Sequence, residues 1–466
     1  MTLGTTATIA VDRPVGGTVP ERADVSTPAV VLKFDPNVMH HGGLGAIRSL
    51  GRMGVPVYAV QESSWAPTGQ SRYLRGKVLW RPAGLSADRI QAGLLHLADL
   101  IGTPSVLIPT DDAGAIFLAE HGNPLREAYL FPDQPASLPR QLAGKHSLHM
   151  LSAELGFPSP GSCLPSSLSE AADVAGAYGF PVVGKLARPW QAQAKQLSTQ
   201  IIRDRAELGA AWQASQAAAA RLMLQEYIPA GAGHDWFFHG YVGSDGRCWP
   251  ACTGVKDRSY PAHAGLTSYG RCVPNTALRD DVTGLLHRLG YRGVADLDFR
   301  FDERDGQYKL LDFNPRLGAQ FRLFTGPGGL DVVRAAYLDL TGQPVTGAEP
   351  ASGRTFMVES YDPLAAISYW RSGEVSLRSW LAASRSVDET AWFARDDPRP
   401  FELMCVRMGW RLLTRLLTRP LAQAVGVRQH GGQDPSGRPA GPRLRRGRSK
   451  AARIWAGGQL TSTRGK

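Results

Sequence analysis

Two strand-like runs near residue 300 hold the residues whose types and spacing best suit chemistry. Val294–Phe301 and Gln307–Phe313 are joined by a turn rich in Asp, Arg and Gly, and this pattern predicts a β-hairpin. Side chains alternate between the two faces of a strand, so Asp298, Asp312 and Asn314 converge if the hairpin brings the matching faces together. Carboxylate and amide oxygens are hard ligands that suit Mg²⁺, so the pattern predicts a metal site.

Arg316 stands two residues after Asn314, where its guanidinium could meet phosphate oxygens that arrive with the metal. The alternative interpretation is a surface hairpin whose acids are solvated. The run Leu310–Asn314 argues against it, because it sets an acid and an amide inside an apolar strand, where burying them unpaired is costly. Two neighbouring acids, Asp296 and Asp302, are interpreted as spectators.

The composition is that of a soluble globular protein. The chain has 466 residues, 43% hydrophobic and 20% charged, a length typical of roughly three domains. No apolar run reaches the roughly eighteen residues that cross a bilayer, and Met1–Asp24 lacks the apolar core of a signal peptide, so we expect a cytoplasmic protein. Five scattered cysteines without a CxxC pair indicate free thiols rather than a zinc site or disulfides.

The net charge of +11 is concentrated at one end of the chain. Arg428–Lys466 contains ten Lys or Arg residues and a single acid, Asp434, which accounts for +9 of the total. The rest of the chain is close to neutral. A dedicated nucleic-acid binder needs a basic groove, so no specific nucleic-acid partner is expected.

The first part of the chain alternates apolar runs with helical segments. Ala29–Phe34 and Val55–Val60 are predicted strands, separated by a glycine-bearing loop at His40–Gly45 and a helix through Leu50. This βαβ pattern predicts a parallel sheet with a helix on its face.

The glycines of this region imitate a dinucleotide-binding fingerprint. Gly42, Gly43 and Gly45 are followed by Glu62 after the next strand, but the spacing is not GxGxxG. Glycines at a strand-to-helix turn also serve close packing. An NAD-dependent oxidoreductase is therefore a less favoured alternative.

Two lysines in the middle of the chain occupy fixed positions. Lys145 opens a helix that runs to about Leu155, and the apolar strand Gly179–Lys185 ends on a lysine. A lysine held rigidly at the end of a strand suits nucleotide phosphate as a point charge. A further apolar strand is predicted at Leu222–Ile228.

Four motifs in this order resemble the ATP-grasp superfamily, and more narrowly its carboxylate–amine ligases with a preceding Rossmann-like domain. They are Lys145 opening a helix, GFPVVGK ending at Lys185, LQEYIPAG starting at Leu224 and LDFNPR ending at Arg316. The resemblance covers Pro28 to Gly342. It implies a Rossmann-like α/β domain followed by an α+β fold that holds ATP between two antiparallel sheets.

The resemblance also implies roles for individual residues. Asp298, Asp312 and Asn314 would hold Mg²⁺, or Mn²⁺ in its place, and Arg316 would face the transferring phosphoryl group or the acyl phosphate. The residues implied for ATP are two phosphate-binding lysines, a hinge strand along the adenine and two candidates for the ribose: Lys145, Lys185, Gln225, Glu226, Tyr227, Ile228, His234 and Asp235.

Two further cations follow a predicted antiparallel pair of strands, Asp235–Val242 and Cys248–Val255. Lys256 and Arg258 are candidates for contacts to a substrate carboxylate or to the γ-phosphate. Solvated charges on a loop are the alternative interpretation.

The sequence departs from the family pattern at two points. Asp298 and Asp312 stand where the family more often has glutamates, which shortens each arm by one methylene. The loop Ala187–Thr199 lacks the glycines that often let the family's loop close over phosphates, although Lys195 could serve as a donor there.

The C-terminal part lies beyond the resemblance. Arg407, Arg411 and Arg415 recur among apolar residues in Phe401–Leu417, which predicts a basic amphipathic helix. This helix could lie on an anionic membrane surface, or pack on the body of the enzyme with its arginines solvated. The predicted divisions are a leader at 1–27, a Rossmann-like domain at 28–135, an ATP-grasp domain at 136–345, a C-terminal extension at 346–427 and a disordered basic tail at 428–466.

The function that the resemblance implies is ATP-dependent ligation of a small-molecule carboxylate to an amine through an acyl phosphate, with release of ADP and phosphate. In such a transfer the protein mainly positions reactants and neutralises charge. A non-catalytic nucleotide-binding or membrane-associated scaffold with the same fold is the alternative. The sequence leaves both substrates and a homodimer open. It places the protein in the cytoplasm, or peripherally at the inner face of the membrane.

Overall fold

The computed structural model describes residues 23–187, 199–263, 265–346 and 349–426. The expectations for the leader before residue 23, for Lys195 and its loop, and for the basic tail fall outside these residues. The described residues up to Met404 form one compact unit, and those from Cys405 belong to a second, so each unit is described by itself.

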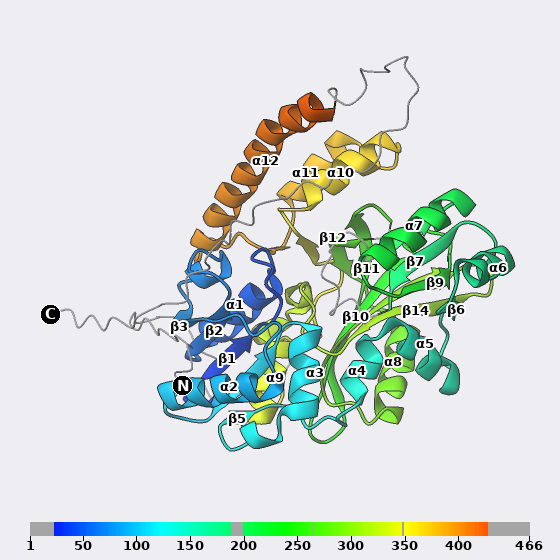
Figure 1. Cartoon of the computed structure of the whole chain (residues 1–466). Helices are drawn as coiled ribbons and strands as arrows, with labels where there is room; N and C mark the ends of the chain where they lie inside the picture. Colours follow the sequence, from blue (N-terminus) through cyan, green and yellow to red (C-terminus); the bar gives the residue numbers. More distant parts are fainter. Residues whose placement is uncertain (1–22, 188–198, 264, 347–348, 427–466) are drawn as a thin grey trace, which may run out of the picture. The chain divides into compact units, whose positions relative to one another are not determined.

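A five-stranded parallel sheet forms the first part of the chain, in the order β3-β2-β1-β4-β5 (Figure 1). Its side chains alternate between two apolar layers: Val31 packs with Ile47 of helix α1, whereas Val30 packs with Leu94 of helix α2. The predicted parallel sheet is therefore confirmed. Its elements are β1 Ala29–Leu32, α1 Gly42–Met53, β2 Val57–Gln61, β3 Leu74–Leu79, α2 Ala87–Ile101, β4 Ser105–Pro109, α3 Asp112–His121 and β5 Tyr129–Leu130.

The glycines predicted to form a loop after β1 lie in the first turn of α1 instead, because that helix begins at Gly42. Close packing explains at least one of them. A Cβ atom on Gly45 would lie 2.7 Å from Cε1 of Phe321, so only glycine lets the helix approach this ring. This contact supports the packing interpretation of the glycines over the dinucleotide fingerprint.

A four-stranded antiparallel sheet follows, in the order β6-β9-β7-β8. Helices α6 and α7 bury small and branched residues such as Ala171 and Leu208 against Val182 of β7. The elements of this part are α4 Leu138–Ala143, α5 Lys145–Glu154, β6 Ser162–Cys163, α6 Leu168–Tyr178, β7 Val182–Leu186, β8 Thr199–Ile202, α7 Arg205–Ala217 and β9 Leu222–Glu226.

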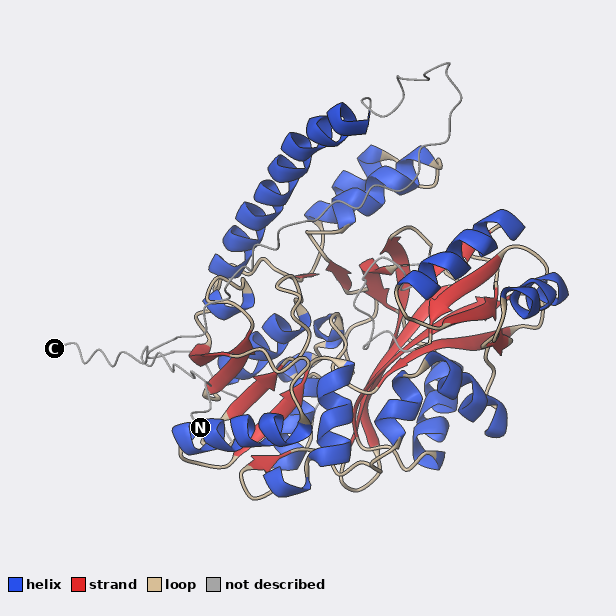
Figure 2. Cartoon of the chain, in the orientation of Figure 1, coloured by secondary structure: helices blue, strands red, loops and turns tan. Residues whose placement is uncertain are grey.

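The largest sheet has seven strands in the order β14-β13-β10-β11-β12-β15-β16. Figure 2 draws the strands in red and the helices in blue. Leu297 and Phe299 of β13 point into a core with Val282 of helix α8, so the intervening residues Asp296 and Asp298 face the other way. This alternation gives the β13–β14 hairpin one apolar and one polar face. The elements are β10 Asp235–Val242, β11 Cys248–Tyr260, β12 Leu266–Cys272, α8 Thr276–Arg288, β13 Gly293–Asp302, β14 Gln307–Asn314, α9 Val332–Leu340, β15 Thr355–Met357 and β16 Glu389–Thr390.

The C-terminal segment adds β15 and β16 to this sheet and three helices, α10 Asp362–Arg371, α11 Leu377–Arg385 and α12 Arg399–Gly426. The helix predicted at Phe401–Leu417 is thus confirmed and is longer than expected. Among the described residues, none of the helices combines the length and apolar character needed to span a membrane.

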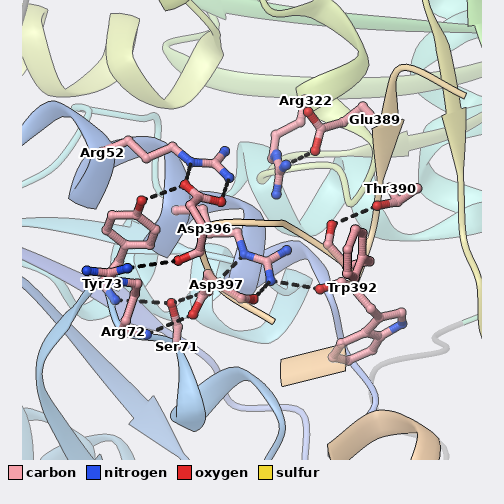
Figure 3. Close-up of polar contacts among 12 residues, drawn as sticks. Arg52, Ser71, Arg72, Tyr73, Arg322, Glu389, Thr390, Trp392, Asp396 and Asp397 are labelled. Carbon is pink, nitrogen blue, oxygen red and sulfur yellow. Dashed lines mark hydrogen bonds and ion pairs between the residues drawn. The ribbon is translucent and has the colours of Figure 1, made fainter. Parts of the chain in front are cut away.

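Buried ion pairs tie the segment before α12 to the parallel-sheet part of the chain (Figure 3). Arg48 of α1 is fully buried, and its Nε donates to Oδ2 of Asp397 at 2.9 Å. Ser71 Oγ donates to the same oxygen at 2.7 Å. The neighbouring Asp396 accepts two hydrogen bonds of 2.8 Å from Arg52 and lies closer to solvent.

Asp397→Ala is expected to lower the free energy of unfolding by about 3–5 kcal/mol, because it leaves the buried guanidinium of Arg48 without its counter-charge. Asp396→Ala serves as the matched control and should cost at most about 1 kcal/mol, since its pair with Arg52 is partly exposed. Urea denaturation at neutral pH measures both. Equal, small losses of unfolding free energy in the two variants would show that Asp397 is not the required counter-charge of Arg48.

Candidate active site

The β13–β14 hairpin places four polar side chains on the face opposite α8. Asp298 pairs with Asp312 across the two strands, and Asp296 pairs with Asn314. Residues directly opposite each other in an antiparallel pair project to the same side, so the four side chains lie together. The structure therefore brings together the predicted metal ligands, with Asp296 as a fourth member.

Two lysines from outside the hairpin share the carboxylate of Asp312. Lys145 Nζ lies 2.7 Å and Lys185 Nζ 3.3 Å from its Oδ1. Lys145 is the first residue of α5, and Lys185 is buried near the end of β7 and also donates to the carbonyl of Leu311 at 3.2 Å. The four-stranded sheet and the hairpin are thus joined through one carboxylate.

Burial and charge act against each other in this group. Burial lowers the pKa of Lys185, with Lys145 adding to the effect, and Asp312 only partly compensates. Burial alone would raise the pKa of Asp312, but the two lysines outweigh it and hold that pKa well below its usual range. Asp312 therefore stays ionised while two ammonium groups compete for it.

A third lysine stands beside the other candidate ligand. Lys256 Nζ of β11 lies 3.1 Å from Oδ1 of Asp298. Burial opposes the charged form of Lys256, but Asp298 and Asp235 outweigh it and raise its pKa. Three ammonium groups around two carboxylates suit a polyanion such as a nucleotide triphosphate.

Asp296 forms the deepest part of the cluster and is 4% exposed. Its Oδ2 accepts hydrogen bonds from Asn314 Nδ2 at 3.2 Å and from Arg316 Nη1 at 3.1 Å. On the other side of Arg316, Nε lies 3.2 Å from Oδ1 of Asp112, the first residue of α3. Asp296, interpreted from the sequence as a spectator, thus contacts two candidate functional residues.

A buried histidine backs the same carboxylate. His239 Nε2 of β10 lies 3.3 Å from Oδ1 of Asp296, without the alignment of a hydrogen bond. Burial raises the pKa of Asp296 to about 7 although Arg316 opposes the shift, and burial lowers the pKa of His239 to about 3. The imidazole is therefore neutral at physiological pH.

The predicted adenine hinge lies on β9 and the loop after it. The strand ends at Glu226, so Tyr227 and Ile228 follow it rather than belong to it. Gln225 Nε2 donates to Ser162 Oγ at 3.0 Å. Glu226 accepts from Arg304 Nη2 at 2.7 Å, which fixes the end of the strand against the β13–β14 turn.

Both ribose candidates already have partners. His234 Nε2 lies 3.1 Å from Oε1 of Glu303. Asp235 accepts two hydrogen bonds from Arg300, of 2.6 and 3.0 Å. Binding of a ribose by either residue would have to compete with these partners.

Of the three catalytic candidates, Arg258 does not contact the cluster around Asp298 and Asp312. Its guanidinium makes two 2.9 Å hydrogen bonds to Asp362 of α10 and lies over the ring of Tyr269 at 4.2 Å. The pair is buried. Arg258 is thus engaged in packing the C-terminal segment on the sheet, while Lys256, two residues earlier, joins the cluster.

Sequence reasoning missed Asp112 and His239. A signal existed for Asp112, since it follows the carboxyl end of β4, where ligand-binding residues of parallel sheets collect. His239 lies in the apolar strand β10 and matches a core residue, so nothing in its local sequence distinguishes it.

The donor set of the hairpin fits a divalent cation. Asp298 and Asp312 offer carboxylate oxygens, and the amide nitrogen of Asn314 is bound to Asp296, which leaves the amide oxygen directed away from that carboxylate. No group of three or more His, Cys, Asp or Glu side chains in the described residues is arranged to hold a metal. Asn314 as the third protein ligand stays a prediction.

Comparison with known proteins places this geometry in context. No protein-family model matches the chain. The crystal structure of an L-amino acid ligase from Bacillus licheniformis superposes with a TM-score of 0.53 and 14% identity, over 71% of this chain and 79% of that one. The biotin carboxylase domain of the Hydrogenobacter thermophilus 2-oxoglutarate carboxylase, solved with MgADP, superposes with a TM-score of 0.50 and 16% identity, over 71% and 73%.

The chain has the ATP-grasp fold. The preceding parallel sheet is its Rossmann-like domain, so the predicted fold class is confirmed. In sequence, the chain is 26% identical over 245 residues to a D-aspartate ligase of Enterococcus faecium (strain Aus0004), which covers 49% of this chain. The match spans 57% of that relative's length.

Asp312→Asn is expected to destabilise this protein, because it leaves two ammonium groups without their carboxylate, whereas Lys185→Met should cost less because Asp312 keeps its pair with Lys145. The double variant removes both charges and should lose less than the sum, with a coupling energy of about 1–3 kcal/mol. A double-mutant cycle by urea denaturation measures it. Strictly additive losses would show that the two groups do not interact.

Proposed function

We propose that this chain is an ATP-dependent ligase that joins a carboxylate to an amine through an acyl phosphate and releases ADP and phosphate. The observation that supports it most is the polar face of the β13–β14 hairpin, where Asp298 and Asp312 meet Lys145, Lys185 and Lys256. An ATP-grasp fold is consistent with nucleotide binding at this place.

The proposed chemistry overcomes the low reactivity of a carboxylate toward an amine. A carboxylate oxygen attacks the γ-phosphorus of ATP, the bond to the β,γ-bridging oxygen breaks, and ADP leaves. The amine nitrogen then attacks the acyl carbon, the carbon–oxygen bond to phosphate breaks, phosphate leaves with the electron pair, and the nitrogen releases a proton. Each step needs positioning and charge neutralisation rather than a nucleophilic side chain.

The residues of the cluster have distinct proposed roles. Lys145 and Lys185 bind phosphate oxygens as point charges, and Lys256 holds Asp298 or the substrate carboxylate. Arg316, fixed between Asp296 and Asp112, faces the acyl phosphate. Mg²⁺ bound at Asp298, Asp312 and Asn314 would neutralise charge on the phosphates.

An amino acid is the proposed substrate class. The similar proteins include a D-aspartate ligase and an L-amino acid ligase, whose names place amino acids among their substrates. A screen of amino acids and other carboxylates against amines, scored by ADP release and followed by mass spectrometry of the product, tests the proposal. ATP binding without ADP release across the panel would favour a non-catalytic scaffold.

The double variant Asp312→Ala/Asn314→Ala is expected to abolish ADP release, a loss of at least about 1,000-fold, because two of the three candidate oxygen ligands are removed. The control is Asp305→Ala/Gln307→Ala, which changes the turn and the first residue of β14 in the same hairpin and should retain near-normal turnover. Steady-state ADP release with the cognate substrates measures both. Full activity of the first variant would overturn the site assignment.

We also propose that α12 and the basic tail bring this otherwise cytoplasmic enzyme to an anionic membrane surface. Val406, Trp410 and Leu413 recur along one side of the helix and are 66%, 67% and 48% exposed. The chain beyond α12 carries ten Lys or Arg residues between 428 and 466. An exposed apolar face followed by positive charge complements a lipid surface with negative headgroups.

Replacing Val406, Trp410 and Leu413 by Ser is expected to weaken binding to phosphatidylglycerol-containing vesicles at least about 10-fold, because apolar area no longer enters the lipid. The matched control replaces Leu364, Ile367 and Trp370 of α10, which are also exposed, and should bind normally. Vesicle co-sedimentation at low and high salt measures both. Equal binding to neutral vesicles would argue against the proposal, and self-association without lipid would indicate a homodimer instead.

A further inference from the structure

The carboxylate of Asp296 occupies a central position that the proposed reaction does not use directly. It stands in register between His239 of β10 and Asn314 of β14, so it is flanked by a neighbour on each side within the sheet. It is 4% exposed and lies one alternation away from Asp298 on the same face. Its side chain lies beside the candidate metal ligands and is more deeply buried than those of Asp298 and Asp312.

One oxygen of Asp296 holds two functional candidates at once. Oδ2 accepts from Asn314 Nδ2 at 3.2 Å and from Arg316 Nη1 at 3.1 Å. Arg316 Nη1 also donates to the carbonyl of Leu317 at 3.0 Å, so the guanidinium is held by its own loop as well. These bonds fix the loop after β14 against β13.

The chemistry of a carboxylate selects one orientation of the asparagine. An ionised carboxylate only accepts hydrogen bonds, whereas an amide has a donor end and an acceptor end. Oδ2 of Asp296 already accepts from Arg316 Nη1, so it acts as an acceptor and binds the nitrogen of Asn314, which leaves the amide oxygen for a cation. Without this partner the side-chain amide of Asn314 could rotate by half a turn at little cost in free energy and present its nitrogen to the metal.

The other side of the carboxylate is closed by tight packing. A Cβ atom on Gly318 would lie 2.1 Å from Cε1 of His239 and 2.6 Å from Cγ of Asp296. Only glycine leaves room for these two side chains, so the loop and the strand fit each other closely. The fully buried ring of His239 in turn limits where the carboxylate can move.

We propose that Asp296 is a positioning residue that orients the amide oxygen of Asn314 toward the bound cation and fixes the guanidinium of Arg316. The inference rests on the proposed function, because it assigns Asn314 to the metal. Partners behind metal ligands typically change metal affinity by about 10- to 100-fold when they are removed.

The test measures binding of Mn²⁺ by electron paramagnetic resonance, in the presence of an ATP analogue with a non-hydrolysable β,γ-imido bridge. Asp296→Asn keeps the shape of the side chain but replaces one acceptor with a donor. We expect it to raise the Mn²⁺ concentration at half-saturation about 10- to 100-fold. Gly318→Ala displaces the same carboxylate from the other side and should shift the half-saturation in the same direction.

A matched control separates positioning from general stability. Asp331 is 2% exposed, its side chain caps α9 and accepts from Ser49, and these partners lie outside the hairpin and the loop that follows it. Asp331→Asn should lower the melting temperature and leave Mn²⁺ half-saturation unchanged. A purely structural role for Asp296 would give the same result as this control.

The outcomes distinguish the two claims. Wild-type binding of Mn²⁺ with the nucleotide, together with weaker Mn²⁺ binding by Asp296→Asn and Gly318→Ala, supports the inference. Unchanged half-saturation in the folded variants overturns it and leaves the proposed function standing. Absence of Mn²⁺ and nucleotide binding in the wild-type protein overturns both.

Discussion

The carboxylate of Asp312 connects structural elements that come from distant parts of the sequence. Lys185 comes from the four-stranded sheet, Lys145 begins the helix α5, and Asp312 belongs to the seven-stranded sheet. Each charge is unfavourable in a buried place by itself, so each depends on the others. Two ammonium groups share one carboxylate, and the arrangement therefore has spare positive charge for an anionic ligand.

Other buried ion pairs in the protein hold parts together instead of facing a site. Arg258 binds Asp362, Arg48 binds Asp397, and Arg322 binds Glu389. Each pair joins the C-terminal segment to an earlier part of the chain, and Figure 3 shows the pair of Arg322 with Glu389. Burial lowers the pKa of Arg322 to about 9, with Arg52 and Arg48 adding to the effect. These arginines differ from Lys145 and Lys185, because those two lysines share the single carboxylate of Asp312.

Local pattern explains what the sequence could predict, and distance along the chain explains what it could not. The alternation in β13 and β14 is a local property, so the hairpin and the convergence of Asp298, Asp312 and Asn314 followed from it. Asp362, the partner of Arg258, is 104 residues away and outside any motif, so the structural role of Arg258 could not be predicted from the sequence. The same holds for Asp296, whose importance depends on contacts with Arg316 and the close approach of Gly318.

We propose that the acids Asp298 and Asp312 of the hairpin form a metal-dependent nucleotide site with Lys145, Lys185 and Lys256. Calorimetric titration of a non-hydrolysable ATP analogue, with and without Mg²⁺, into the wild-type protein and Lys185→Met tests it most directly. We expect binding that needs Mg²⁺ and is weakened at least about 10-fold in Lys185→Met, the expected loss for a charge-assisted phosphate contact. An affinity for the analogue that changes neither on removal of Mg²⁺ nor in Lys185→Met would contradict the proposed site.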